Sequence, residues 1–247
     1  MPVPVNWFMD WFNSPYYHLH YSDRDEQKAA AFINHFITQL NMSPGSSVLD
    51  VACGRGHFSK LFADKGIDVT GIDIAAESIT YAIETEGDNL HFYQHDVRLP
   101  FRVNYYDYAF NFFTGFGYFK SEREDQNVIR TISNALKPQG TLVLDYLNVH
   151  YSEDHLVYLE ETKRNDVTFC ITRWLDETHF YKKIIVEDER NKAPLEFYEK
   201  TAKYSLGDFN DMFAFNNLQL QEVYGDYQFN AYDIKNSPRL LMVAKKK

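Results

Sequence analysis

Apolar residues in the first part of the chain recur with the period of an α-helix. Residues 26–41 place Phe32, Phe36 and Leu40 four positions apart, which predicts an amphipathic helix with one apolar face. A Ser-Pro-Gly turn interrupts this pattern. Residues 47–51 follow as a short apolar run that is typical of a buried strand.

Strand patterns then alternate with helical patterns as far as residue 146. The predicted strands are residues 47–51, 68–73, 90–94, 106–113 and 141–146, and the predicted helices are residues 56–65, 75–84 and 122–136. Strands that are joined by helices favour right-handed βαβ crossovers. We therefore expect a mostly parallel sheet that is covered by helices on both faces.

The alternation of strands and helices ends near Tyr151, where three strand patterns follow one another without a helix between them. These strands are predicted at residues 167–174, 179–189 and 196–206, and they indicate an antiparallel insertion. A short helix at residues 206–216 and a closing pair of strands at residues 218–224 and 240–244 follow. The expected fold class is α/β, with a doubly wound, mostly parallel seven-stranded sheet and an antiparallel β insertion.

The composition fits one large packed domain with an insertion. The 247 residues are 45% hydrophobic and 24% charged, which excludes global disorder. The aromatic content of 17% suits the wall of a large pocket. A formal net charge of −10 disfavours nucleic acid and anionic membranes as partners.

Cysteine and histidine usage suggests neither a disulfide scaffold nor a metal site. Cys53 and Cys170 are the two cysteines, and His18 and His20 lack the neighbours that a metal site needs. The chain has no signal-peptide pattern at its start and no apolar run of the roughly 20 residues that a membrane helix needs. We expect a cytoplasmic protein that binds no metal.

The segment of residues 48–59 is the most informative for function. A buried strand runs into a loop with Gly54 and Gly56 and then into a helix, which brings backbone N–H groups towards a ligand at the carboxyl edge of the sheet. The alternative is that the two glycines only make a tight turn. Asp73 ends the next strand at about the distance expected of a ribose-binding carboxylate, which favours the ligand site.

Two residues near the glycine loop bear on which nucleoside it binds. A dinucleotide site prefers a glycine where Ser59 stands, and Asp50, directly before the loop, would repel a pyrophosphate. A ligand that carries a sulfonium or ammonium cation would instead be stabilised by Asp50. The loop therefore suits a cationic nucleoside better than NAD.

Five short motifs follow one another along the chain: Asp50-Val51-Ala52-Cys53-Gly54-Arg55-Gly56, Gly71-Ile72-Asp73-Ile74, His95-Asp96-Val97, Asn111-Phe112-Phe113 and Leu136-Lys137-Pro138-Gln139-Gly140. With these motifs the sequence resembles the class I S-adenosylmethionine-dependent methyltransferases. The motifs cover most of the chain between the first helix and the fifth strand, and the likeness resumes at the C-terminal strands. The resemblance implies a Rossmann-like fold and S-adenosylmethionine as the cofactor.

The resemblance also assigns roles to single residues. Asp73 would accept both ribose hydroxyls and Ile74 would pack on the adenine, whose amine would donate to Asp96; a turn or helix cap is the alternative role for Asp96. Ala52 stands where the family more often has a glycine, and we interpret Cys53 as a small buried residue. The implied cofactor-binding set is Tyr21, Arg24, Asp50, Ala52, Cys53, Gly54, Gly56, Asp73, Ile74, Asp96, Val97 and Asn111.

Residues 1–25 are expected to form a lid over this cofactor. Arg24 would hold the cofactor carboxylate as a bidentate fork, and Tyr21 would lie over the sulfonium. Alternatively, Arg24 pairs with a neighbouring carboxylate on the surface and Tyr21 packs against the first helix.

The acceptor is expected beside the aromatic loop that follows the fourth strand and beneath the insertion. The candidate substrate-binding residues are Phe116, Tyr118, Tyr146, His150, Trp174 and Tyr181. No general base can be assigned. The insertion would cover the active site and exclude water, or its edge strands would pair in a homodimer.

We therefore expect a chain of three segments with methyltransferase activity. The segments are a lid at residues 1–25, a methyltransferase domain at residues 26–150 and 207–247, and a substrate-cover module at residues 151–206. The expected activity is methyl transfer from S-adenosylmethionine to nitrogen or oxygen of a small molecule. The alternatives are a cofactor-binding regulatory protein without methyl transfer and an NAD-dependent oxidoreductase.

Overall fold

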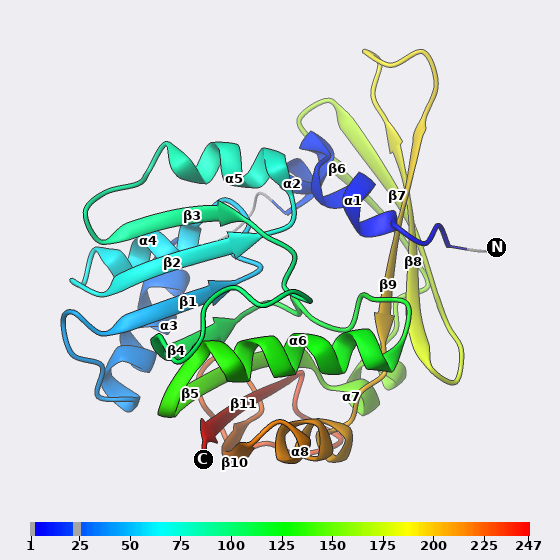
Figure 1. Cartoon of the computed structure of the whole chain (residues 1–247). Helices are drawn as coiled ribbons and strands as arrows, with labels where there is room; N and C mark the ends of the chain where they lie inside the picture. Colours follow the sequence, from blue (N-terminus) through cyan, green and yellow to red (C-terminus); the bar gives the residue numbers. More distant parts are fainter. Residues whose placement is uncertain (1–2, 22–25) are drawn as a thin grey trace.

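The main sheet has seven strands in the order β10-β11-β5-β4-β1-β2-β3 (Figure 1). The computed structural model describes residues 3–21 and 26–247. The strands are β1 (Ser47–Val51), β2 (Asp68–Asp73), β3 (Leu90–Gln94), β4 (Tyr106–Asn111), β5 (Leu136–Leu147), β10 (Leu218–Tyr224) and β11 (Arg239–Lys246). All pairs from β3 to β5 are parallel, and β11 is antiparallel to both β5 and β10. The doubly wound seven-stranded sheet that the sequence predicts is therefore confirmed.

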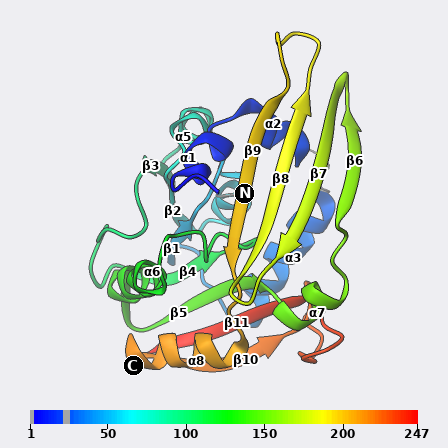
Figure 2. The same cartoon turned by 90° about the vertical axis from the view of Figure 1, so that its right-hand side faces the viewer.

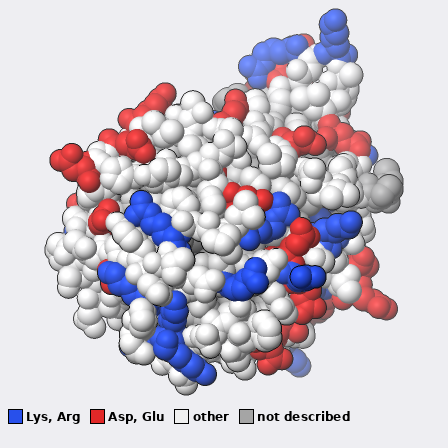
Figure 3. All heavy atoms as spheres, in the orientation of Figure 1, with Lys and Arg blue, Asp and Glu red and all other residues white. Residues whose placement is uncertain are grey.

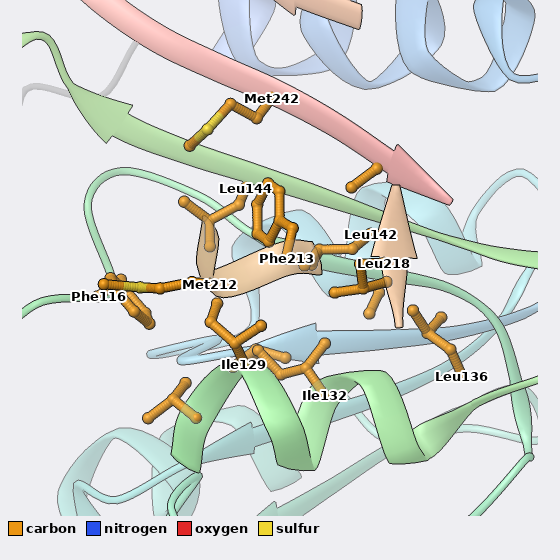
Figure 4. Packing of buried hydrophobic residues seen from close by; sticks show 14 of the residues in the cluster. Phe116, Ile129, Ile132, Leu136, Leu142, Leu144, Met212, Phe213, Leu218 and Met242 are labelled. Carbon is orange, nitrogen blue, oxygen red and sulfur yellow. The ribbon is translucent and has the colours of Figure 1, made fainter. Parts of the chain in front are cut away.

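Successive side chains of a strand point to opposite faces of the sheet, and in this sheet both sets are largely apolar. Helices therefore cover both faces. On one face Val48 lies in a cluster with residues of α3 (Glu26–Gln39), α4 (His57–Ala63) and α5 (Ala76–Ile83). On the other face Leu49 lies in a cluster with α6 (Glu122–Ala135) and α8 (Leu206–Phe215). Figure 4 shows this second cluster, where Met212 and Phe213 of α8 meet Ile129 and Ile132 of α6.

The predicted insertion is a separate antiparallel sheet of four strands (Figure 2). Its strands are β6 (Leu159–Arg164), β7 (Val167–Leu175), β8 (His179–Glu187) and β9 (Leu195–Ala202), in that order across the sheet. A short helix, α7 (Val149–Asp154), leads into it from β5.

Two short elements of this region are absent from the sequence prediction, and one predicted strand has the wrong end. The sequence predicts neither α7 nor β6, because β6 carries charged residues on both of its faces and shows no apolar alternation. The last predicted strand of the insertion is also too long, since β9 ends at Ala202 and Ser205 caps α8 through a capping box with Asp208.

The N-terminal segment forms two short helices that pack on the inner face of the inserted sheet. These are α1 (Trp7–Phe12) and α2 (Pro15–His20), and the apolar side chains of α1 share a buried cluster with Phe169, Ile184 and Val186. None of the helices in the described part of the chain is long and apolar enough to cross a membrane.

Candidate cofactor and acceptor site

The loop between β1 and α4 keeps an open space beside its backbone. Ala52, Gly54 and Gly56 all have left-handed backbones, with φ of 58°, 56° and 77°. A Cβ on Gly54 would have no atom within 4 Å, whereas a Cβ on Gly56 would overlap the ring of Phe92. Gly54 therefore leaves room for a ligand, and Gly56 is required by packing in the empty protein.

Asp73 at the end of β2 faces this loop and holds it in place. The backbone N–H of Gly54 donates to Asp73 Oδ2 and that of Ala75 donates to Oδ1, each at 2.8 Å. Burial raises the pKa of Asp73 above its ordinary value. The carboxylate is thus positioned with free lone pairs on both oxygens.

Asp50 is a second buried carboxylate beside the same loop. It is 3% exposed, and Ser59 Oγ donates to its Oδ2 at 2.5 Å. Burial raises the pKa of Asp50 to about 7, in spite of the hydrogen bond from Ser59. Burial also raises the pKa of the Cys53 thiol well above its ordinary value, so Cys53 is a neutral thiol and not an activated nucleophile.

A cavity of about 390 Å³ lies against these groups. Nine of the predicted cofactor residues line it: Tyr21, Asp50, Ala52, Cys53, Gly54, Asp73, Ile74, Asp96 and Val97. Side chains of α1 and α2 close it from the other side, with Phe8, Phe12 and Tyr17 in its wall. The residues present fit an adenosyl cation, because the carboxylates of Asp50 and Asp73 line the same cavity as the open space at Gly54.

Three of the predicted cofactor residues do not line this cavity within the described structure. Gly56 packs on Phe92. Asn111 lies behind the loop, where its Nδ2 donates to the carbonyls of Val51 and Gly115 at 2.9 and 3.3 Å. Arg24 falls outside the described residues.

Asp96 has a partner that the sequence prediction missed. Arg98 donates to both oxygens of Asp96, with a closest distance of 2.7 Å, and it also pairs with Glu124 at 2.8 Å. Burial acts to raise the pKa of Asp96, but the hydrogen bonds and charge of Arg98 outweigh it and lower the pKa. Arg98 therefore keeps Asp96 ionised and ready to accept a further hydrogen bond.

A second cavity of about 960 Å³ adjoins the first. The two cavities share Tyr17, Tyr21, Phe58, Phe113 and Tyr118. Most of the rest of the second wall comes from α3, from β9 of the insertion and from the turn before β11, and Thr114, Leu147 and Arg239 complete it. A ligand in the second cavity would therefore meet a ligand in the first at a ring of aromatic side chains.

A partly buried polar cluster stands in the wall of the second cavity. Glu199 of β9 accepts hydrogen bonds from Trp11 Nε1 at 2.7 Å and from the Tyr21 hydroxyl at 3.0 Å. Lys182 Nζ lies 2.9 Å from Glu199 Oε2 and donates to the Tyr21 oxygen at 2.7 Å. Burial acts to raise the pKa of Glu199, but Lys182 and the hydrogen bonds outweigh it and leave the pKa below its ordinary value.

The loop after β4 is held in an unusual conformation at the junction of the cavities. Phe113 and Thr114 both have left-handed backbones, with φ of 56° and 61°, which is costly for residues with a Cβ. Asp145 accepts from the Phe113 N–H at 2.7 Å and from Arg239 Nε at 2.9 Å. Arg239 Nη2 also donates to Thr114 Oγ1 at 2.8 Å.

Asp145 and Arg239 are absent from the sequence prediction, although one signal for them exists. Asp145 stands in an otherwise apolar predicted strand, and a lone carboxylate in a buried strand needs a partner. The pairing with Arg239 follows from the antiparallel register of β5 and β11, which the sequence pattern does not reveal.

Of the six predicted substrate-binding residues, Tyr118 lines both cavities and five lie elsewhere. Phe116 is 1% exposed and belongs to the core beside Met212 (Figure 4). Tyr146 is fully buried, and its hydroxyl donates to the carbonyl of Ala202 at 2.6 Å. These two aromatic residues pack in the core of the protein and line neither cavity.

The other three corrections concern surface residues of the insertion and of α7. His150 is exposed on α7. Trp174 and Tyr181 stack on one another with ring centroids 5.3 Å apart, on the outer face of the inserted sheet, because strand alternation places Phe169 and Ile171 on the inner face.

Comparison with known proteins agrees with this geometry. A family model described as a methyltransferase domain matches residues 42–205. The chain belongs to this family. The predicted membership of the class I S-adenosylmethionine-dependent methyltransferases is thereby confirmed.

One curated relative is a ubiquinone biosynthesis O-methyltransferase from Xanthomonas campestris pv. campestris (strain B100). It is 30% identical over 177 residues, which cover 68% of this chain and 66% of the relative. A shorter match covers 41% of a relative from Bacillus subtilis (strain 168). The chain thus spans less than two thirds of the length of these relatives.

Two solved structures share the fold over almost the whole chain. An S-adenosylmethionine-dependent methyltransferase from Clostridium acetobutylicum ATCC 824 has a TM-score of 0.78 at 16% identity, over 94% of this chain and 96% of that one. CalS10, an amino pentose methyltransferase from Micromonospora echinaspora solved with S-adenosylmethionine bound, has a TM-score of 0.68 at 17% identity, over 95% and 98%.

Proposed function

We propose that this protein transfers a methyl group from S-adenosylmethionine to a nitrogen or oxygen atom of a small molecule. The observation that carries this proposal is the pair of adjoining cavities, one lined by the glycine loop with Asp50 and Asp73, the other by aromatic residues and β9. Family membership supports the same reaction.

The first cavity would hold the cofactor. Asp73 would accept the ribose hydroxyls, Ile74 and Val97 would contact the adenine, and Asp50 would face the positively charged end. Bound there, the cofactor supplies an electrophilic methyl group on a sulfonium. The chain itself contributes orientation and the exclusion of water, since α1 and α2 close the cavity.

The second cavity would hold the acceptor with its nucleophilic atom at the shared aromatic ring. Tyr118 and Tyr21 would lie closest to the transferred methyl group, because both line the two cavities. The named relatives include an O-methyltransferase and an amino pentose methyltransferase, which supports oxygen and nitrogen as the acceptor atoms to be tested.

The remaining features of the hypothesis belong to this proposal. We infer a cytoplasmic enzyme with a lid at residues 1–25, a methyltransferase domain at residues 26–150 and 207–247, and a cover module at residues 151–206. We also infer that two copies associate through the inserted sheet. Nucleic acid is not expected as an acceptor, because the net charge is −10.

Calorimetric titration with S-adenosylmethionine, its demethylated product and NAD tests the cofactor assignment. Binding of both adenosyl ligands, weakened by Asp73→Ala, is the expected result. Binding of NAD without binding of either adenosyl ligand would indicate an NAD-dependent oxidoreductase instead. Cofactor binding without turnover across phenol and amine acceptors would favour a regulatory protein.

A further inference from the structure

Strand β6 leaves one edge of the inserted sheet without a partner strand among the described residues. It is the first strand in the order β6-β7-β8-β9 and lies at the outer edge in Figure 2. An unusual run of exposed apolar residues leads into it: Val157, Tyr158 and Leu159 are 58%, 61% and 74% exposed. A free edge of this kind is a template for pairing with another strand.

The charges along β6 are arranged in two blocks of opposite sign. The strand reads Leu159-Glu160-Glu161-Thr162-Lys163-Arg164, acidic before Thr162 and basic after it. A strand with this pattern is complementary to itself when it runs antiparallel to a second copy.

We propose that a second copy of this chain pairs with β6 in an antiparallel arrangement about a two-fold axis at Thr162, which joins the two inserted sheets into one sheet of eight strands. This inference specifies the surface for the association proposed above and therefore rests on it. In this register Glu161 lies opposite Lys163 of the second copy, and Glu160 lies opposite Arg164.

Backbone geometry limits the possible registers, and charge selects this one among them. The Arg173 N–H donates to the Tyr158 carbonyl, so even-numbered residues at this edge turn their backbone groups towards β7 and odd-numbered residues turn theirs outwards. Outward residues must face one another in the pair. An axis at Glu161 would place Glu161 opposite itself, and an axis at Lys163 would place two lysines together, whereas the axis at Thr162 brings opposite charges together.

The side chains of Glu161 and Lys163 are available for such pairing. Glu161 and Lys163 are both exposed on the outer face, and no ion pair within the described ranges 3–21 and 26–247 involves either of them. Glu160 also pairs with Arg173 of its own chain, and the Lys163 carbonyl accepts from Arg164 Nη1 at 3.2 Å. The pair of Glu161 with Lys163 of the second copy, on the outer face, therefore determines most of the preference for this register.

Thr162 would be the residue on the two-fold axis of the pair. Its Oγ1 is buried and has no hydrogen-bond partner in the described part of the chain. On the proposed axis two Thr162 side chains would be direct cross-strand neighbours, a pair that is favourable in antiparallel sheets.

Pairing at β6 would leave the acceptor cavity accessible. The cavity is lined by Glu199 and Thr201 of β9, the strand at the opposite edge of the sheet. The second copy would thus support the cover sheet from its free side without entering the site.

Charge reversal tests the proposal, with sedimentation velocity over a dilution series as the measurement. The wild-type protein is expected to dimerise, and Glu161→Lys or Lys163→Glu alone should weaken the dimer by about ten-fold or more, since each places two like-charged pairs across the interface. The double variant should restore it. Lys200→Glu on β9 is the matched control and should have no effect on the dimer.

A cross-link tests the register. In a Cys170→Ser background, Thr162→Cys should form an intermolecular disulfide under mild oxidation, because opposed residues of a non-hydrogen-bonded pair lie about 4.5 Å apart. Lys163→Cys should not. A monomeric wild type, a dimer that tolerates both single reversals, or a Thr162→Cys protein that does not cross-link would each overturn the proposal. Cofactor titration on the same proteins reports separately on the proposed function.

Discussion

The indole Nε1 of Trp11 donates a 2.7 Å hydrogen bond to Glu199 Oε1, across 188 residues of sequence. This bond joins the N-terminal helix α1 to β9 of the inserted sheet. Both partners belong to segments that close the cavities, since α1 lines the first and Glu199 the second. Helix α1 and the inserted sheet therefore form one structural unit beside the junction of the two cavities.

Replacing Glu199 should loosen this unit. Glu199→Gln removes the charge that compensates Lys182, whose side chain is 14% exposed, and we expect a loss of about 2 kcal/mol in the free energy of unfolding. Urea denaturation measures it. The matched control is Glu196→Gln on the same strand, which breaks the pair with Lys183 on the outer face and should change stability little because that pair is solvated. Equal effects of the two variants would contradict the role given to Glu199.

Asp145 and Arg239 should matter for turnover more than for cofactor binding. Arg239→Lys removes the fork that holds both Asp145 and Thr114, so the strained Phe113–Thr114 backbone is expected to relax away from the junction. We predict that kcat/KM for the acceptor falls by about 10 to 100-fold, with the dissociation constant for S-adenosylmethionine unchanged. Steady-state kinetics and calorimetry separate the two effects. A variant that loses cofactor affinity to the same extent would show that the loop serves the first cavity.

The sequence was sufficient for the sheet and for one cavity because both depend on local patterns. Asp50, Gly54 and Asp73 stand at fixed offsets from predicted strand ends, and the carboxyl ends of parallel strands meet at one edge. Eight of the twelve residues implied by the family resemblance line the first cavity for this reason, and a ninth, Tyr21, reaches it from the end of α2.

The sequence predicts the lining of the second cavity less well, because that lining depends on long-range register. A shift of one residue in strand register moves every side chain of the strand to the other face of the sheet. Trp174 and Tyr181 lie on the outer face, away from the cavities. Glu199 and Arg239 reach the site only through the placement of β9 and β11, and their partners are 178 and 94 residues away in sequence.

The affinity for S-adenosylmethionine should rise with pH up to about 7. The pKa of Asp50 is raised to about 7 by burial, so below that pH the empty protein holds a proton that a cationic ligand must displace. Affinity should fall by about ten-fold for each pH unit below 7 if only the ionised carboxylate binds the cation. Calorimetry in buffers of different ionisation enthalpy measures the proton released on binding. Asp50→Asn should bind weakly and without this pH dependence.

The same carboxyl group should make the empty protein less stable as the pH rises. A folded-state pKa above the unfolded value means that the folded protein binds the proton more tightly, so the contribution of Asp50 to stability is greatest in acid and is lost between about pH 4 and pH 7. Asp50→Asn should flatten the pH dependence of unfolding over this range. A slope that is unchanged in the variant would assign the effect to another group.

A methyl group on Gly54 should separate the binding function of the loop from its conformation. Gly54 has φ of +56° and open space where a Cβ would lie, and Gly45, in the turn after α3, has φ of +82° and equally open space. Alanine at either position adds the same side chain to a left-handed backbone, so both variants should lose about 1 kcal/mol of stability. Only Gly54→Ala places the methyl group in the first cavity, and we expect it to weaken S-adenosylmethionine binding by about ten-fold or more, while Gly45→Ala binds as the wild type does. If calorimetry gave both variants wild-type affinity, the open space beside Gly54 would not be the cofactor site.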